Sequence, residues 1–159
     1  MSAKALYDTA PLGALVRYSN GQPQLPARFT RKLRAWQGEN GVGRLIGKTP
    51  SARYGDYVSP ASFTLHIGDY GFQAVVVIVL HRTYGVDSPL AFEVIESPPA
   101  GAVLCLTPFG DGHELKFLAS DRAAARAWHA SQGRYSDPSY REVQPDGAHL
   151  DIALEALAA

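Results

Sequence analysis

The chain has 159 residues, of which 46% are hydrophobic and 19% are charged, and its formal net charge at pH 7 is zero. This length and apolar share are typical of one folded domain and exclude a disordered chain. The single cysteine, Cys105, excludes an intramolecular disulfide. No apolar stretch approaches the roughly 20 residues of a membrane-spanning helix, and the first residues lack the apolar segment of a secretory signal. We therefore expect a cytoplasmic protein that does not contact a membrane.

Charge is divided unevenly along the chain. Residues 1–60 carry nine basic and three acidic side chains, whereas residues 61–159 carry six basic and twelve acidic ones. We expect a single domain over residues 1–159, in which a basic and less regular part, residues 1–60, precedes an α+β body, residues 62–158. A basic segment on an acidic body indicates either an anion-binding surface or two parts of one domain that attract each other.

The first predicted elements lie in the basic part. Residues 12–18 have the composition of a strand and end at a turn signal, residues 19–21. Residues 27–36 place apolar side chains at i, i+4 and i+7, which predicts a short helix, with a strand or hairpin as the alternative. These apolar residues are Phe29, Leu33 and Trp36. Residues 49–60 have no apolar period and indicate a loop.

Strand patterns dominate the middle of the chain. The stretch 73–82 contains a continuous aliphatic run, which predicts a central strand that is covered on both faces. Short spacings leave no room for crossover helices, so these strands are expected to form an antiparallel meander. The predicted strands span residues 62–67, 72–82, 90–96, 102–107 and 114–118.

The pattern changes after residue 119. Ser120 is a suitable N-cap for a helix over residues 121–131, and residues 140–143 suit one more short strand. Asp146 precedes a stripe of apolar residues that predicts a final helix. The stripe consists of Leu150, Ala153, Leu154 and Leu157. The whole pattern predicts an α+β fold: a five- to six-stranded antiparallel sheet, two C-terminal helices and a short basic N-terminal helix or hairpin.

The basic segment is the main candidate for binding nucleic acid or another anion. Its cations could neutralise phosphates while Tyr18, Phe29 or Trp36 stack on bases. The alternative is a solvated helix whose aromatic side chains face the core. The candidate binding residues are Arg28, Arg31, Lys32 and Arg34.

The histidines do not predict a metal site. No two of them lie at i, i+2 or i, i+4, and there is no second cysteine. A tight turn over residues 68–71 would place His66 opposite Gln73 and far from His81. We therefore expect neither a metal nor another cofactor.

One arrangement of residues suggests an enzyme. An arginine on an early strand, a Ser-Phe-Thr strand and a glutamate on a later strand resemble the site of ADP-ribosyltransferases. The resemblance implies that the arginine holds dinucleotide phosphates, that the Ser-x-Thr strand shapes the nicotinamide pocket and that the glutamate stabilises an oxocarbenium charge. Glu93 and Glu96 are three apart on a strand, so they are expected on opposite faces and not as an acid–base pair. The residues concerned are Arg17, Ser62, Phe63, Thr64 and Glu93 or Glu96.

Two stretches carry a further resemblance, PARFTRKL at residues 26–33 and SFTLHIGD at residues 62–69. They resemble stretches of small uncharacterised proteins encoded on proteobacterial plasmids and other mobile elements. The resemblance covers under half of the chain and implies no known activity. It implies only a setting in which small proteins often bind host or element components.

No convergent set of titratable residues has a spacing typical of an enzyme. We therefore predict a non-catalytic binding or regulatory protein that acts by contact with a macromolecule, with a protein partner or inhibitor-type role favoured. Exposed aromatics of the 49–60 loop, Tyr54 and Tyr57, are the candidate protein-binding residues. Nucleic-acid binding through residues 28–34 and an ADP-ribosyltransferase-like activity are the alternatives.

Overall fold

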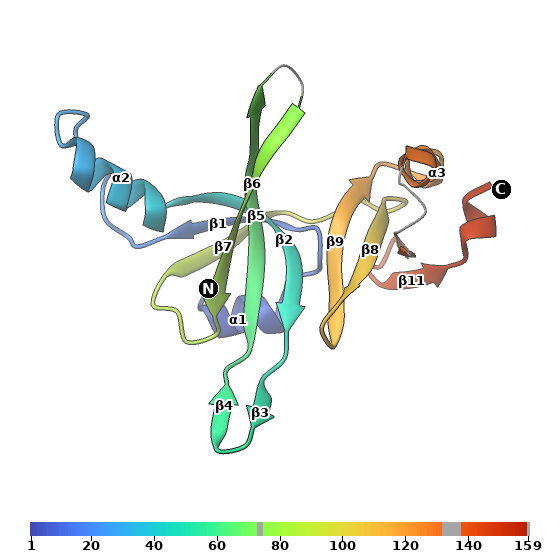
Figure 1. The fold of residues 1–159 in the computed structure, drawn as a ribbon, viewed down its shortest axis with the longest axis horizontal. Helices are drawn as coiled ribbons and strands as arrows, with labels where there is room; N and C mark the ends of the chain where they lie inside the picture. The colour runs from blue at the N-terminus through green and yellow to red at the C-terminus, as the bar shows by residue number, and fades with distance from the viewer. Residues whose placement is uncertain (73–74, 132–137, 159) are drawn as a thin grey trace.

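Antiparallel strands make up most of the molecule (Figure 1). The computed structural model describes residues 1–72, 75–131 and 138–158. Within these residues nine strands form one sheet, and β3 (Ala52–Tyr54) and β4 (Tyr57–Ser59) form a separate hairpin. The large sheet contains β1 (Leu15–Ser19), β2 (Gly41–Thr49), β5 (Ser62–Phe72), β6 (Val75–Gly85), β7 (Ala91–Glu96), β8 (Val103–Phe109), β9 (Gly112–Ala119), β10 (Ser139–Val143) and β11 (His149–Ile152).

The predicted α+β fold with a five- to six-stranded meander is therefore wrong, although the strands predicted from the sequence are present. The strand order is β11-β10-β8-β9-β2-β1-β7, and β5 pairs with both β2 and β6. Strand β2 thus pairs with three strands: β1, which precedes it in the sequence, and β5 and β9, which are separated from it by other strands. This branching sheet could not be read from spacings because it depends on non-local pairing.

Helices are few and short in the described residues. They are α1 (Ala3–Thr9), α2 (Thr30–Glu39), α3 (Arg122–Ser131) and the 3₁₀ helix η1 (Leu154–Ala158). Helix α1 was not predicted from the sequence; its N-cap Ser2 accepts a hydrogen bond from the Ala5 amide at 3.2 Å. The predicted helix over residues 121–131 is present as α3, but its cap is Asp121, which accepts from the Ala124 amide at 2.8 Å. No helix in these described ranges has the length and apolar character needed to cross a membrane.

The final helix predicted after Asp146 is wrong. Its first half is strand β11, which pairs with β10, and only its end forms a single 3₁₀ turn. The expected apolar stripe is divided accordingly: Leu157 is buried, whereas Leu150 and Leu154 are exposed. Asp146 instead accepts a hydrogen bond from the Ala148 amide, which closes the turn before β11.

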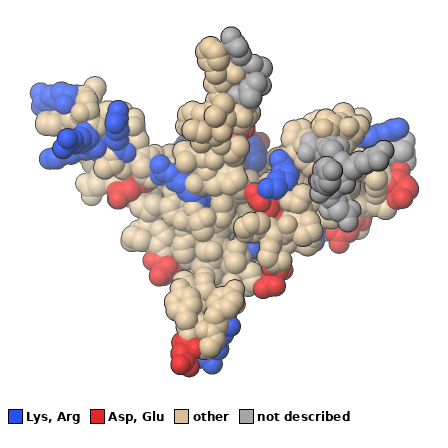
Figure 2. Space-filling view, viewed as in Figure 1, with Lys and Arg blue, Asp and Glu red and all other residues tan. Residues whose placement is uncertain are grey.

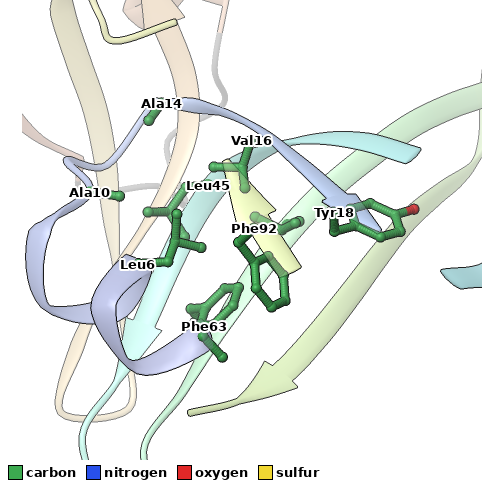
Figure 3. Close-up of a cluster of buried hydrophobic side chains, with 10 residues drawn as sticks. Leu6, Ala10, Ala14, Val16, Tyr18, Leu45, Phe63 and Phe92 are labelled. Carbon is green, nitrogen blue, oxygen red and sulfur yellow. The ribbon is translucent and has the colours of Figure 1, made fainter. Parts of the chain in front are cut away.

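One core lies between α1 and the strands β1, β2, β5 and β7 (Figure 3). Leu6 from α1 packs there with Phe63 and Phe92, whose rings meet edge to face at a centroid distance of 5.2 Å. The buried members of this core are Ala3, Leu6, Ala10, Ala14, Val16, Tyr18, Leu45, Phe63, Leu65 and Phe92.

Two further cores lie on opposite faces of β8. Leu104 and Leu106 join one core with Ile46 of β2, while Val103 and Cys105 join the other with Ala125 of α3. All four of these β8 side chains are completely buried. The strand covered on both faces is therefore β8.

The predicted central strand over residues 73–82 is wrong. Its described aliphatic side chains lie on β6, which projects from the body with the end of β5 (Figure 1). The side chains of Val76, Val77, Ile78 and Val79 are each between 52% and 71% exposed. A continuous apolar run was correctly recognised as a strand, but its burial depends on a neighbour that the fold does not supply.

Burial makes the Cys105 thiol inert. It is completely buried, and burial raises its pKa to about 12 because the thiolate is disfavoured in the core. We expect an aromatic disulfide reagent to leave the native protein unlabelled at pH 8 and to label one thiol per chain after denaturation. The measurement is absorbance of the released thiolate, and rapid labelling of the native protein would contradict the core position of β8.

A bidentate salt bridge between Arg122 and Glu142 joins α3 to β10. Arg122 donates from Nε and Nη2 to the two carboxylate oxygens of Glu142, each at 2.9 Å, which holds the pKa of that carboxyl below its usual range. The stabilisation is therefore complete above the ordinary glutamate pKa and is lost as pH falls through the lowered value. We expect Glu142→Gln to lower the melting temperature at pH 7 and to lose this difference from wild type in strong acid. Thermal melts followed by circular dichroism test this, with exposed Glu155→Gln as the charge-matched control.

Candidate functional site

The basic helix α2 belongs to a segment that stands away from the sheet (Figure 1). This segment, the basic arm, comprises residues 20–40 and joins β1 to β2, which pair up to Tyr18 and Gly41. None of the α2 residues is buried. Figure 2 shows Lys and Arg side chains gathered over the arm. The fold therefore presents the basic segment to solvent.

A clasp of two asparagines closes the base of the basic arm. Asn40 accepts from the Ser19 hydroxyl at 2.8 Å, and its amide group donates to Asn20 Oδ1 at 3.0 Å and to the Trp36 carbonyl at 2.8 Å. Asn20 in turn donates to Glu39 Oε2 at 2.7 Å. These bonds tie the first and last residues of the arm together where the two strands end.

The apolar side of α2 faces the preceding chain of the arm. The Trp36 indole donates to the Gln22 carbonyl at 2.8 Å, and α2 lines a hollow of about 370 Å³ with residues 20–25. Leu33 is half-buried, and Phe29 is 42% exposed. The interpretation that these aromatics face the core of the body is wrong, because they lie in none of the three buried clusters.

The cations of the arm are exposed and carry no ion pair to any described residue. The Arg28 guanidinium lies over the Phe29 ring, 4.9 Å from its centroid. The acidic side chain of α2, Glu39, is held at the clasp by Asn20. All four candidates, Arg28, Arg31, Lys32 and Arg34, thus lie on one small projecting element.

A polar groove runs between β9 and the β5–β6 pair. It consists of two adjoining hollows of about 490 and 280 Å³, which share His81 and Glu114. A bulge in β5 at Ile67 puts His66 and Asp69 on one side, where His66 Nε2 lies 2.8 Å from Asp69 Oδ1. His81 pairs directly with His66, with ring centroids 5.6 Å apart.

The expected separation of His66 and His81 is wrong. The predicted turn over residues 68–71 is not formed, since β5 continues to Phe72, and so His66 lies opposite His81. Even so, no cluster of three or more His, Cys, Asp or Glu suited to a metal ion occurs among the described residues. Recognising the pair would have required knowing that the glycine-rich stretch 68–71 is part of a strand.

The cationic side chains that line the groove form hydrogen bonds within the protein. Arg44 donates to the Gly13 carbonyl at 2.5 Å, and Lys116 donates to Glu114 at 2.7 Å. Lys48 donates to the Tyr7 carbonyl, and burial lowers the pKa of Lys48. The groove therefore offers a ligand fewer available cations than the basic arm does.

The residues that resemble an ADP-ribosyltransferase site are not brought together. Arg17 and Glu93 form an exposed ion pair of 2.7 Å between β1 and β7. Ser62 pairs with Thr49 of β2, whereas Arg17 pairs with Val42, seven positions away along the same strand. At about 3.3 Å per residue this separates Ser62 from the pair by roughly 23 Å.

The two glutamates of β7 lie differently from the expectation. A register shift leaves Ile95 as an extra residue, so Glu93 lies opposite Arg17 and Glu96 lies opposite Leu15. Because these partners are two apart on β1, both glutamates point to the same face. The expectation of opposite faces is therefore wrong, since it assumed a regular strand.

Tyr54 and Tyr57 lie at the tip of the β3–β4 hairpin within the expected loop. They are direct partners across the hairpin and are 68% and 64% exposed. Their role in binding a protein stays a prediction.

The clasp yields a prediction about the basic arm. Because no α2 residue is buried, we expect Asn40→Ala to increase amide hydrogen exchange in residues 30–39 by about tenfold or more, without affecting β8. Hydrogen exchange followed by mass spectrometry measures both regions. Gln37→Ala, an exposed change on the same helix, is the control, and unchanged exchange in Asn40→Ala would show that the clasp does not hold the arm.

Comparison with known proteins bears on the family alone. No curated protein and no solved structure matches the chain. The mobile-element setting that the sequence resemblance implies stays a prediction. A family model described as "Uncharacterised conserved protein UCP036055" matches residues 1–147, and the chain therefore belongs to that family.

Proposed function

We propose that this protein is a non-catalytic binding protein and that its basic arm binds the phosphate backbone of nucleic acids. The observation that carries the proposal is the position of the arm: it projects from the sheet and presents four cations that pair with no acidic group in the described residues. Exposed, unpaired cations are available to replace the counterions that surround nucleic-acid phosphates.

The contacts of α2 favour this role over a purely structural one. A helix that packs on the sheet would need its apolar side chains in the core, but Trp36 is satisfied by Gln22 within the arm. Helix α2 contributes no side chain to the buried clusters, so core packing does not account for the clasp that holds the helix and its basic side chains in place. Binding of an extended anion supplies that reason.

The same contacts limit how the arm recognises its ligand. The Trp36 ring is held against the preceding chain, so base stacking on Trp36 is not part of the proposal. Four point contacts to phosphate carry little sequence information. We therefore expect weak, sequence-tolerant binding that depends strongly on salt, in a cytoplasmic protein whose net charge of zero confines the attraction to the arm.

The experiment uses fluorescence anisotropy with labelled single-stranded and duplex oligonucleotides over a range of salt concentrations. The test variant replaces every cation of the arm by glutamine. For wild type we expect log affinity to fall with log salt with a slope of about −3 to −4, and for the variant we expect a slope near zero. The four substitutions are Arg28→Gln, Arg31→Gln, Lys32→Gln and Arg34→Gln.

A charge-matched variant separates the arm from net charge. It carries Lys4→Gln, Arg53→Gln, Lys116→Gln and Arg126→Gln, which are exposed and lie outside the arm. This control should keep most of the affinity and the wild-type slope. Wild-type protein that does not bind at about 50 mM salt, or binds without salt dependence, would overturn the nucleic-acid role. Contact with a protein partner, for which Tyr54 and Tyr57 are exposed, would then be the remaining proposal.

A further inference from the structure

The free end of the β5–β6 hairpin is the most exposed apolar part of the described chain. This ribbon comprises residues 69–72 of β5 and residues 76–80 of β6. Figure 1 shows that it projects from the sheet. Its exposed side chains are Tyr70 at 56%, Phe72 at 74%, Val76 at 56%, Val77 at 71%, Ile78 at 59% and Val79 at 52%.

Both faces of the ribbon are apolar. Tyr70 and Gly71 are successive residues of β5 and point to opposite faces, so their partners on β6, Ile78 and Val76, place an aliphatic side chain on each face. Together the six exposed side chains leave on the order of 600 Å² of apolar surface, the upper end of what a monomer usually exposes in one patch. Such a surface favours contact with a partner.

The ribbon also leaves a strand edge open. Among the described strands β6 pairs with β5 alone, so the amides and carbonyls along its outer edge have no strand partner. Exposed edges are commonly protected by charged residues or proline, but the sequence has neither between Asp69 and Arg82. One bulge, at Val77, is the protective feature that remains.

This open edge decides the class of partner. A lipid surface would cover the aliphatic side chains, but it cannot supply hydrogen bonds to the unpaired backbone groups of a two-stranded ribbon. A polypeptide strand supplies both hydrogen bonds and apolar contact. The partner is therefore another strand.

We propose that two copies of this chain associate through their ribbons, with β6 of each copy pairing antiparallel with β6 of the other. A twofold contact is self-complementary, so each open edge satisfies the other. The two patches together expose about 1,200 Å², and β6–β6 pairing covers the part along β6 in addition to the backbone groups, so the contact belongs to the small, dissociable class of interface. Because residues 70–81 contain no Lys, Arg, Asp or Glu, the twofold axis brings no like charges together.

This proposal is independent of the proposed nucleic-acid binding. The ribbon contains none of the four cations of the basic arm, and the arm contributes no strand to the sheet. Loss of self-association therefore leaves single-site nucleic-acid binding intact, and loss of nucleic-acid binding leaves the dimer intact.

The test is sedimentation velocity of the full chain over a range of concentrations. We expect a dimer that dissociates in the range of about 1–10 µM. Val77→Lys and Ile78→Lys, tested singly, should each weaken it by roughly 100-fold, because the symmetric contact contains every substitution twice. Val58→Lys is the matched control, since Val58 is 51% exposed on the other hairpin, and it should not change the dimer.

A second measurement locates the contact. Single cysteines introduced at residues 76–79 should give disulfide-linked dimers at positions near the twofold axis, while buried Cys105 stays unlinked. Circular dichroism should show that all variants fold, because these side chains lie outside the buried clusters.

Three outcomes would overturn the proposal. The first is a wild type that stays monomeric at about 100 µM. The second is a dimer that Val77→Lys and Ile78→Lys leave unchanged, which would assign the contact to another face. The third is a monomer that sediments with neutral phosphatidylcholine vesicles and loses this binding in the lysine variants, which would assign the ribbon to a lipid surface.

Discussion

Strand β2 is the element on which the rest of the structure depends, because it joins the two halves of the sheet. It pairs with β1 and β5 along most of its length and with β9 at Gly47. A bulge beside Leu45 accompanies a division of burial: Leu45 packs into the core under α1, and Ile46 packs into the core beside β8. A Cβ at Gly43 would lie 3.0 Å from the His66 carbonyl oxygen and 3.0 Å from Leu65 Cβ, so the close approach of β2 and β5 at this point favours glycine.

The elements that form the buried cores differ from the two projections that are available to bind partners. Buried side chains concentrate on α1, on both faces of β8 and on the strands between them, whereas the basic arm and the ribbon lie outside the three buried clusters. Both projections are connections between neighbouring antiparallel strands, which can lengthen without disturbing the sheet. One presents charge and the other presents apolar side chains and a backbone edge, so each fits a chemically different partner.

The local sequence pattern correctly predicts where most strands lie, but not which strands pair with one another. Alternation in residues 62–67 correctly predicts β5, but the glycines at 68 and 71, which favour a turn, continue the strand. A bulge had a similar effect, because one extra residue in β7 reversed the expected facing of Glu93 and Glu96. For the candidate site, the four cations were predicted from the sequence, while the asparagine clasp that positions them depends on pairing between residues 20 positions apart.

By itself the sequence determined the composition of each segment: the strand-forming runs, the helix α3, the cluster of cations in residues 28–34 and the uncharged stretch before Arg82. Only the tertiary structure decided which of two similar aliphatic runs is buried. Residues 102–106 lie between two packed layers, whereas the run on β6 extends with the end of β5 past the rest of the sheet. Burial is a property of surrounding elements, and those elements are brought together by non-local strand pairing that no local pattern specifies.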